Sequence, residues 1–118
     1  MRKKVAFITG GSAFTDVPHE SIYCGAKAGV TLFAQAVGLE QKDEEYGFEV
    51  ITIGPGTVDT YMYQVARSKN KEDYLWVDLA KQMYEKGDLE KPDKVAEKIY
   101  IILSNRYDQG QYVKAFEV

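Results

Sequence analysis

Two short, largely apolar segments that end in glycine-rich turns place the strongest constraint on the fold of this chain. Residues 5–8 are all apolar and are followed by Thr-Gly-Gly, and residues 48–53 are rich in β-branched side chains and are followed by Gly-Pro-Gly. Such segments are typical of strands that are covered on both faces of a parallel sheet. Residues 22–45 carry apolar side chains at helical spacing, with Ser21 as the expected N-cap and a stop at Gly47. The order predicts two buried parallel strands joined by a helical crossover.

The rest of the chain predicts further helices and a closing strand. Pro92 stands where the first turn of a helix tolerates proline, because that turn leaves its N–H groups unpaired. All elements together predict a single α/β domain over residues 1–118, with crossover helices in three layers and a small parallel sheet of about three strands. The remaining expected elements are helices over residues 60–68, 71–86 and 92–105 and a strand over residues 110–116.

The composition argues against several classes of function. The chain has 118 residues, of which 45% are hydrophobic and 28% charged, as in one globular domain. A formal net charge of −3 gives no cationic surplus for a nucleic acid or an anionic membrane. Cys24 is the single cysteine and His19 the single histidine, so we expect no internal disulfide and no metal site. We expect no signal peptide and no membrane span, and therefore a cytoplasmic protein.

A tyrosine and a lysine form the first candidate for chemistry. Tyr23 and Lys27 stand four residues apart in the predicted long helix, so their side chains share one helix face. An ammonium favours the ionised form of a nearby phenol, and such a phenol is suited to general acid–base catalysis. The chain holds 9 Tyr and 15 Lys+Arg, however, so chance supplies roughly one such pair. By itself, the pair is therefore also explained by a solvated helix face.

Several motifs that follow one another along the chain favour a functional role for Tyr23 and Lys27 over a solvated helix face. Tyr23 opens the sequence Tyr-Cys-Gly-Ala-Lys-Ala-Gly-Val behind a loop of glycine and serine, and Pro55 opens Pro-Gly-Thr-Val-Asp-Thr after the second strand. In this order the chain resembles the carboxyl-terminal half of the short-chain dehydrogenase/reductase family, and within it the sepiapterin reductase and benzil reductase group. Further matches to that group are Val58-Asp59-Thr60-x-Met62, Ala66-Arg67-Ser68, Lys71-Glu72-Asp73 and the Gly-Asp-Leu before Pro92.

The resemblance implies a partial Rossmann-like fold and an NAD(P)H-dependent carbonyl reductase that acts on a small molecule. It implies that Tyr23 protonates the carbonyl oxygen as hydride arrives from the nicotinamide. It also implies that Lys27 holds the ribose hydroxyls of NADP or NAD and supports the tyrosine. The alternative for the Pro-Gly sequence is a simple turn after a strand. Beside Lys27, the residues that the resemblance places against the cofactor are Pro55, Gly56, Val58 and Thr60.

The chain departs from the family pattern at the third catalytic position. Counted back from Tyr23, the serine that orients the substrate in the family falls on Gly10, which has no hydroxyl. Thr9 and Ser12 are close in sequence but out of register. Ser12 is the serine that we carry as the third candidate catalytic residue.

A second departure concerns the cofactor. The glycine-rich turn, the residue that selects NAD or NADP, and the Asn-Asn-Ala-Gly stretch of the family's amino-terminal half are absent from the sequence. Residues 4–12 also resemble the family's first strand, so we expect a truncated or internally deleted reductase whose own affinity for a dinucleotide is weak. The alternative is a non-catalytic dimerisation or interaction domain. Its motivation is the unpaired edge of the strand at residues 5–8, which favours a homo-oligomer or a second polypeptide.

Overall fold

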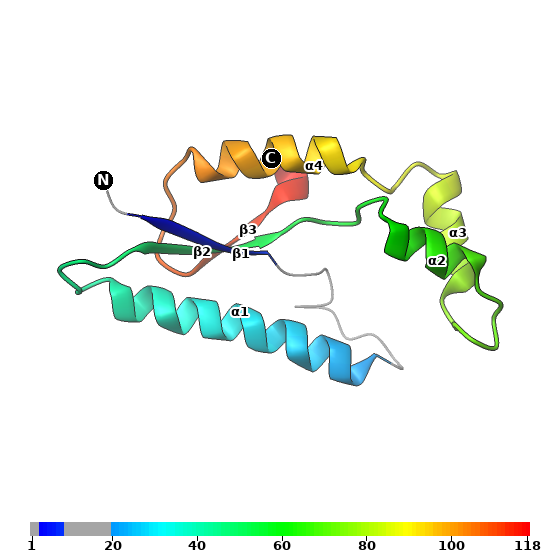
Figure 1. The fold of residues 1–118 in the computed structure, drawn as a ribbon, viewed down its shortest axis with the longest axis horizontal. Coiled ribbons are helices and arrows are strands. Elements are labelled where there is room, and N and C mark those ends of the chain that lie inside the picture. The colour runs from blue at the N-terminus through cyan, green and yellow to red at the C-terminus, as the bar shows by residue number, and fades with distance from the viewer. Residues whose placement is uncertain (1–2, 9–19) are drawn as a thin grey trace. The chain divides into compact units, whose positions relative to one another are not determined.

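The computed structural model describes residues 3–8 and 20–118. Contacts within the chain define two compact units, which are described separately. The first unit comprises Met1–Gly56 and Lys98–Val118, and the second comprises Thr57–Glu97. In chain order the elements are β1 (Lys4–Ile8), α1 (Ser21–Gln41), β2 (Glu49–Gly54), α2 (Tyr61–Ser68), α3 (Val77–Glu85), α4 (Pro92–Leu103), β3 (Gln111–Lys114) and the 3₁₀ helix η2 (Ala115–Glu117) (Figure 1).

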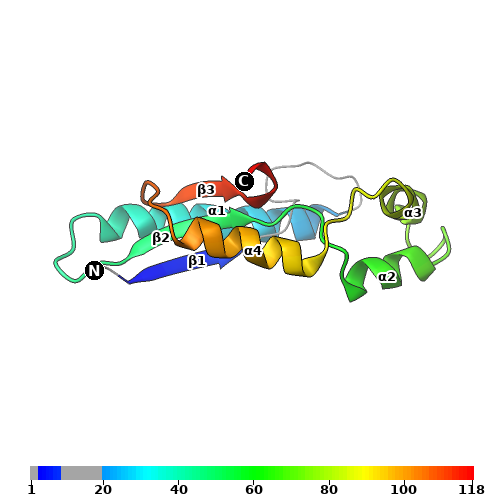
Figure 2. The same cartoon turned by 90° about the horizontal axis from the view of Figure 1, so that it is seen from above.

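The sheet of the first unit has three parallel strands in the order β1-β2-β3, so the predicted small parallel sheet is confirmed. Figure 2 shows β2 between the two other strands. Residues 50–54 of β2 are all buried, whereas Val5 of β1 is 36% exposed. The expectation that both early strands are buried is therefore wrong for Val5. The physical reason is its place on an edge strand, because α1 packs chiefly against the central strand.

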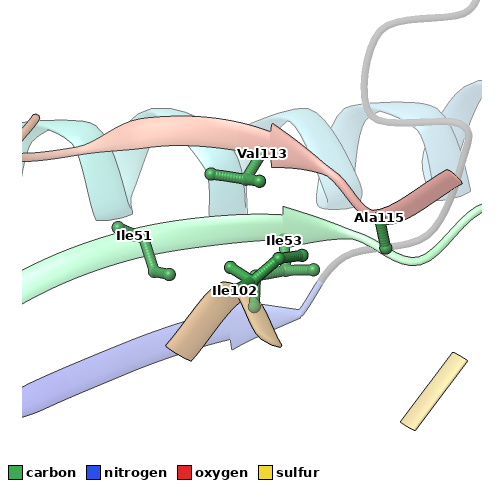
Figure 3. Close-up of a cluster of buried hydrophobic side chains, with 5 residues drawn as sticks. All are labelled: Ile51, Ile53, Ile102, Val113 and Ala115. Atoms are coloured by element: carbon green, nitrogen blue, oxygen red, sulfur yellow. The ribbon is translucent and has the colours of Figure 1, made fainter. Parts of the chain in front are cut away.

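The first unit has three layers, with α1 on one face of the sheet and the part of α4 from Lys98 onward on the other (Figure 1). Thr31, Ala34 and Gly38 are the buried residues of α1. On the opposite face, the carboxyl-terminal half of α4 contributes Ile102 to a buried cluster on β2 and β3 (Figure 3). Alternation along a strand places every second side chain on one face. The members of this cluster are Ile51, Ile53, Ile102, Val113 and Ala115.

Two glycines let α1 approach the start of β3 closely. A Cβ atom on Gly38 would lie 2.6 Å from the backbone nitrogen of Gly110. Gly110 has a φ of +74°, and a Cβ atom there would lie 2.8 Å from Cα of Gln35. Its N–H donates to the carbonyl of Val50 at 2.8 Å. A side chain at either position would collide with backbone, so the two glycines fix the distance between helix and sheet.

The first residue of β1 holds the end of α4. Nζ of Lys4 donates hydrogen bonds of 3.0 Å to the carbonyl oxygens of Leu103 and Asn105. It also lies 3.8 Å from the carboxylate of Glu49. The last carbonyls of a helix lack intrahelical partners and carry partial negative charge, so an ammonium stabilises them. Lys4 therefore caps a helix that is almost 100 residues away in sequence.

Several element boundaries differ from those expected. The long helix ends at Gln41 rather than near residue 45, since acidic Asp43, Glu44 and Glu45 are unfavourable at the negative end of a helix. Ser21 is the first residue of α1 and not its N-cap, which is Glu20 without a side-chain cap bond.

The later boundaries differ as well. The helix expected over residues 71–86 covers only Val77–Glu85. Before it, the side chain of Asn70 accepts a hydrogen bond from the N–H of Asp73, a local turn that competes with helix. The expected closing strand stops at Lys114 and continues as η2.

The expectation that no segment matches a membrane span needs correction. Within the described residues, the 21-residue helix α1 is long and apolar enough to cross a bilayer by length and composition. The helix nevertheless buries Thr31, Ala34 and Gly38 within the first unit. Core helices of soluble proteins pass the same test, so this feature is weak evidence for a membrane.

Candidate active site

Tyr23 and Lys27 extend the face of α1 that packs on the sheet. They precede the fully buried Thr31 at intervals of four residues, so the three side chains form one stripe along the helix. The helix follows β1 and leads back to the start of β2, and its first turns therefore lie toward the carboxyl ends of the strands (Figure 1). In parallel α/β sheets this is the edge where ligands bind.

The structure brings Tyr23 and Lys27 together. Nζ of Lys27 lies 5.6 Å from the centre of the Tyr23 ring, within the range of a cation–π contact. Tyr23 is 41% exposed and Lys27 is half-buried. The hydroxyl of Thr31 donates to the carbonyl of Lys27 at 3.3 Å. This arrangement places an ammonium over the ring of a tyrosine at the start of α1.

The turn after β2 lies at the same edge of the first unit. Gly56 has a φ of +81°, a conformation that residues with side chains rarely adopt. A Cβ atom on Gly56 would lie 3.1 Å from a ring carbon of Phe116 in η2. One residue before Pro55, the phenol of Tyr112 fills the space that a Cβ atom on Gly54 would occupy. Glycines at positions 54 and 56 thus allow aromatic side chains to pack directly on this backbone.

Val58 and Thr60 belong to the second unit. Val58 forms a parallel bridge with Glu90, in which the N–H of Asp59 donates to the carbonyl of Glu90 at 2.8 Å and the N–H of Glu90 donates to the carbonyl of Thr57 at 3.0 Å. This pattern uses both backbone groups of Glu90, so the N–H and C=O of Val58 point to the opposite side. Thr60 is the N-cap of α2, but its side chain makes no cap hydrogen bond.

Some of the predicted site lies outside the described residues. Ser12, Thr9 and Gly10 all fall in the range 9–19, so the third catalytic position is not placed by the structure. Among residues 3–8 and 20–118, no group of three or more His, Cys, Asp and Glu side chains is arranged to hold a metal ion.

Sequence reasoning gave no role to Tyr112, Arg67 or Tyr84. The guanidinium of Arg67 contacts both the carboxylate of Asp59 and the ring of Tyr84 in the second unit. These partners lie 8 and 17 positions away in the sequence, and no local periodicity connects them. Arg67 stood within a family-like Ala-Arg-Ser motif, which was the one available signal.

Comparisons with known proteins identify the family. The sequence matches the model of the short chain dehydrogenase family over residues 3–71. The benzil reductase ((S)-benzoin forming) of Bacillus subtilis (strain 168) is 34% identical over 110 residues, which cover 93% of this chain and 45% of that relative.

Solved structures show the same fold. The KRED1-Pglu enzyme superimposes with a TM-score of 0.76 at 22% identity, over 93% of this chain and 46% of that one. A variant of the actinorhodin polyketide ketoreductase, solved with NADPH, gives a TM-score of 0.73 at 22% identity, over 96% of this chain and 45% of that one. The chain spans about half the length of each of these proteins. Both the predicted α/β fold and the predicted resemblance are confirmed, and the chain belongs to the short-chain dehydrogenase/reductase family.

Proposed function

We propose that the chain carries the acid–base part of an NAD(P)H-dependent carbonyl reductase site, with Tyr23 as the proton donor. The observation that carries the proposal is the contact between Lys27 and Tyr23, with 5.6 Å between the ammonium and the ring centre. Lys27 and Tyr23 stand four and eight residues before Thr31, which is buried in α1.

The chemistry assigned to this chain is proton transfer and charge stabilisation. A reduced nicotinamide, when bound, would supply hydride to the carbonyl carbon. The electron pair of the C=O bond moves to the oxygen, and the hydroxyl of Tyr23 gives that oxygen its proton. The ammonium of Lys27 stabilises the phenolate that Tyr23 becomes, and solvent returns the proton.

The described residues offer features that fit a nicotinamide. In the second unit, the N–H and C=O of Val58 point away from Glu90 and suit a carboxamide, which both donates and accepts hydrogen bonds. The hydroxyl of Thr60 is not used to cap α2. Benzil, the substrate named for the Bacillus subtilis relative, is the first carbonyl compound to test.

A second candidate function, as a dimerisation or interaction domain, is favoured by two surfaces. Among the described residues nothing pairs with the outer edge of β1, and free strand edges invite another chain. The outer face of α1 also exposes large apolar side chains, whereas its buried face is small. The most exposed of these side chains on α1 are Ile22, Leu32, Phe33 and Leu39.

Calorimetric titration of the purified chain with NADPH separates the two functions. The reductase proposal predicts saturable heat below about 1 mM cofactor, equivalent to at least ~4 kcal/mol of binding free energy. It also predicts weaker binding for Lys27→Met, because the ammonium that holds the ribose is lost. Lys81→Met, at an exposed position in α3, is the matched control and keeps the wild-type affinity. Absence of heat at millimolar NADPH contradicts the reductase proposal, and a dilute-solution mass of one chain contradicts the interaction domain.

A further inference from the structure

We propose that Arg67 is a positioning residue, which fixes the Thr57–Thr60 loop in the conformation that presents the peptide groups of Val58. This inference rests on the proposed function, in which that loop contacts the nicotinamide. Its evidence is a contact between three segments of the second unit. The guanidinium lies 3.2 Å from the carboxylate of Asp59 and 4.0 Å from the centre of the Tyr84 ring.

The Arg67 contact differs from an ordinary surface ion pair by its burial. The side chain of Arg67 is 16% exposed and that of Asp59 is 30% exposed. By contrast, the pair formed by Lys71 and Asp78 has a separation of 3.9 Å and side chains that are 74% and 64% exposed. Water screens the partly buried pair of Arg67 and Asp59 less than it screens an exposed pair, which contributes little. Asp59, just before α2, is therefore held to Arg67 by a contact that is stronger than an ordinary surface ion pair.

The loop is anchored by backbone groups on the side opposite to Val58. The bridge to Glu90 fixes Thr57 and Asp59, and the hydroxyl of Thr57 donates to the carbonyl of Asp88 at 3.0 Å. These bonds align the loop with residues 88–90. At the other end of the loop, where it enters α2, the side chain of Thr60 makes no cap hydrogen bond. There the ion pair between Asp59 and Arg67 holds the loop to α2. Backbone bridge and ion pair together determine which way the N–H and C=O of Val58 face.

Arginine is the residue type that this role requires. Its planar guanidinium donates hydrogen bonds in its plane to a carboxylate while its flat face stacks on an aromatic ring. A lysine at the same position keeps the charge but loses the stacked plane. We therefore expect Arg67→Lys to restore only part of what Arg67→Met removes. Tyr84 is 53% exposed, so its contribution is to orient the guanidinium rather than to bury it.

The test compares the wild-type chain with Arg67→Met, Arg67→Lys and Asp59→Asn, and uses Lys71→Met as the matched control in the same unit. The first readout is hydrogen exchange of the amides of Asp59 and Glu90, which donate the two bridge bonds. We expect exchange about tenfold faster in Arg67→Met, since hydrogen bonds to charged groups contribute more than neutral ones. Exchange in β2 and in the Lys71→Met control is expected to stay at the wild-type rate.

The second readout is NADPH affinity, measured through the fluorescence of Trp76, the single tryptophan of the chain. A positioning role predicts a roughly tenfold weaker affinity for Arg67→Met and an intermediate value for Arg67→Lys. Faster exchange with unchanged NADPH affinity means a merely structural role and overturns the proposal, as does unchanged exchange. A wild-type chain that does not bind NADPH contradicts the proposed function instead. In that case exchange still decides whether Arg67 holds the loop.

Discussion

At the scale of single residues, two glycines of α1 differ in the space that surrounds them. Gly38 faces the backbone of Gly110, whereas a Cβ atom on Gly29 would have nothing within 4 Å of it. The same substitution thus meets backbone at one site and open space at the other. Helix propensity alone, which favours alanine over glycine at both sites, predicts no such difference.

We predict that Gly38→Ala lowers the free energy of unfolding by about 1–3 kcal/mol, because the new methyl group forces α1 away from the sheet. Gly29→Ala is the matched control and is expected to raise it by about 0.5–1 kcal/mol. Urea denaturation followed by circular dichroism measures both. Equal effects of the two substitutions would show that α1 and the turn at Gly110 are not in contact.

At the scale of elements, the capping of α4 by Lys4 joins the first strand to the last helix. We predict that Lys4→Met destabilises the chain by about 1 kcal/mol, because two carbonyl groups lose a charged donor. Lys94→Met removes an exposed ion pair with Glu97 and is expected to change stability by less than about 0.5 kcal/mol. Thermal or urea denaturation compares the two variants. A larger loss for Lys94→Met would contradict the assigned cap.

The elements also show how far sequence patterns reach. The apolar segments and the helical spacing of apolar residues predicted the three strands and the two helices that cover the sheet. Burial in the core requires apolar side chains at the regular intervals of a strand or a helix, so these patterns can be found in the sequence. The predicted helix boundaries were wrong where local polar side chains determine the end of a helix, as at Asn70 before α3 and after Gln41 in α1. The spacing of Tyr23 and Lys27 predicted that they share a helix face, and only the family resemblance singled them out as a candidate site. The contact of Arg67 with Asp59 and Tyr84 was not predicted. Such contacts depend on how separate helices meet, which no local pattern encodes.

At the scale of the whole molecule, the chain places a phenol beside an ammonium within about half the length of its relatives. The three-stranded sheet leaves β1 at an edge. In the proposal, proton transfer belongs to Tyr23 and Lys27 of the first unit. The proposed activity therefore depends above all on one tyrosine.

The most direct test measures NADPH oxidation with benzil for the wild-type chain, Tyr23→Phe and Tyr46→Phe. Tyr46 is 90% exposed and provides the same chemical change away from α1. We predict that Tyr23→Phe lowers turnover by about a hundredfold or more, the usual loss when a general acid is removed, while Tyr46→Phe keeps the wild-type rate. Turnover of Tyr23→Phe equal to that of the wild type would contradict the assignment of Tyr23 as the proton donor.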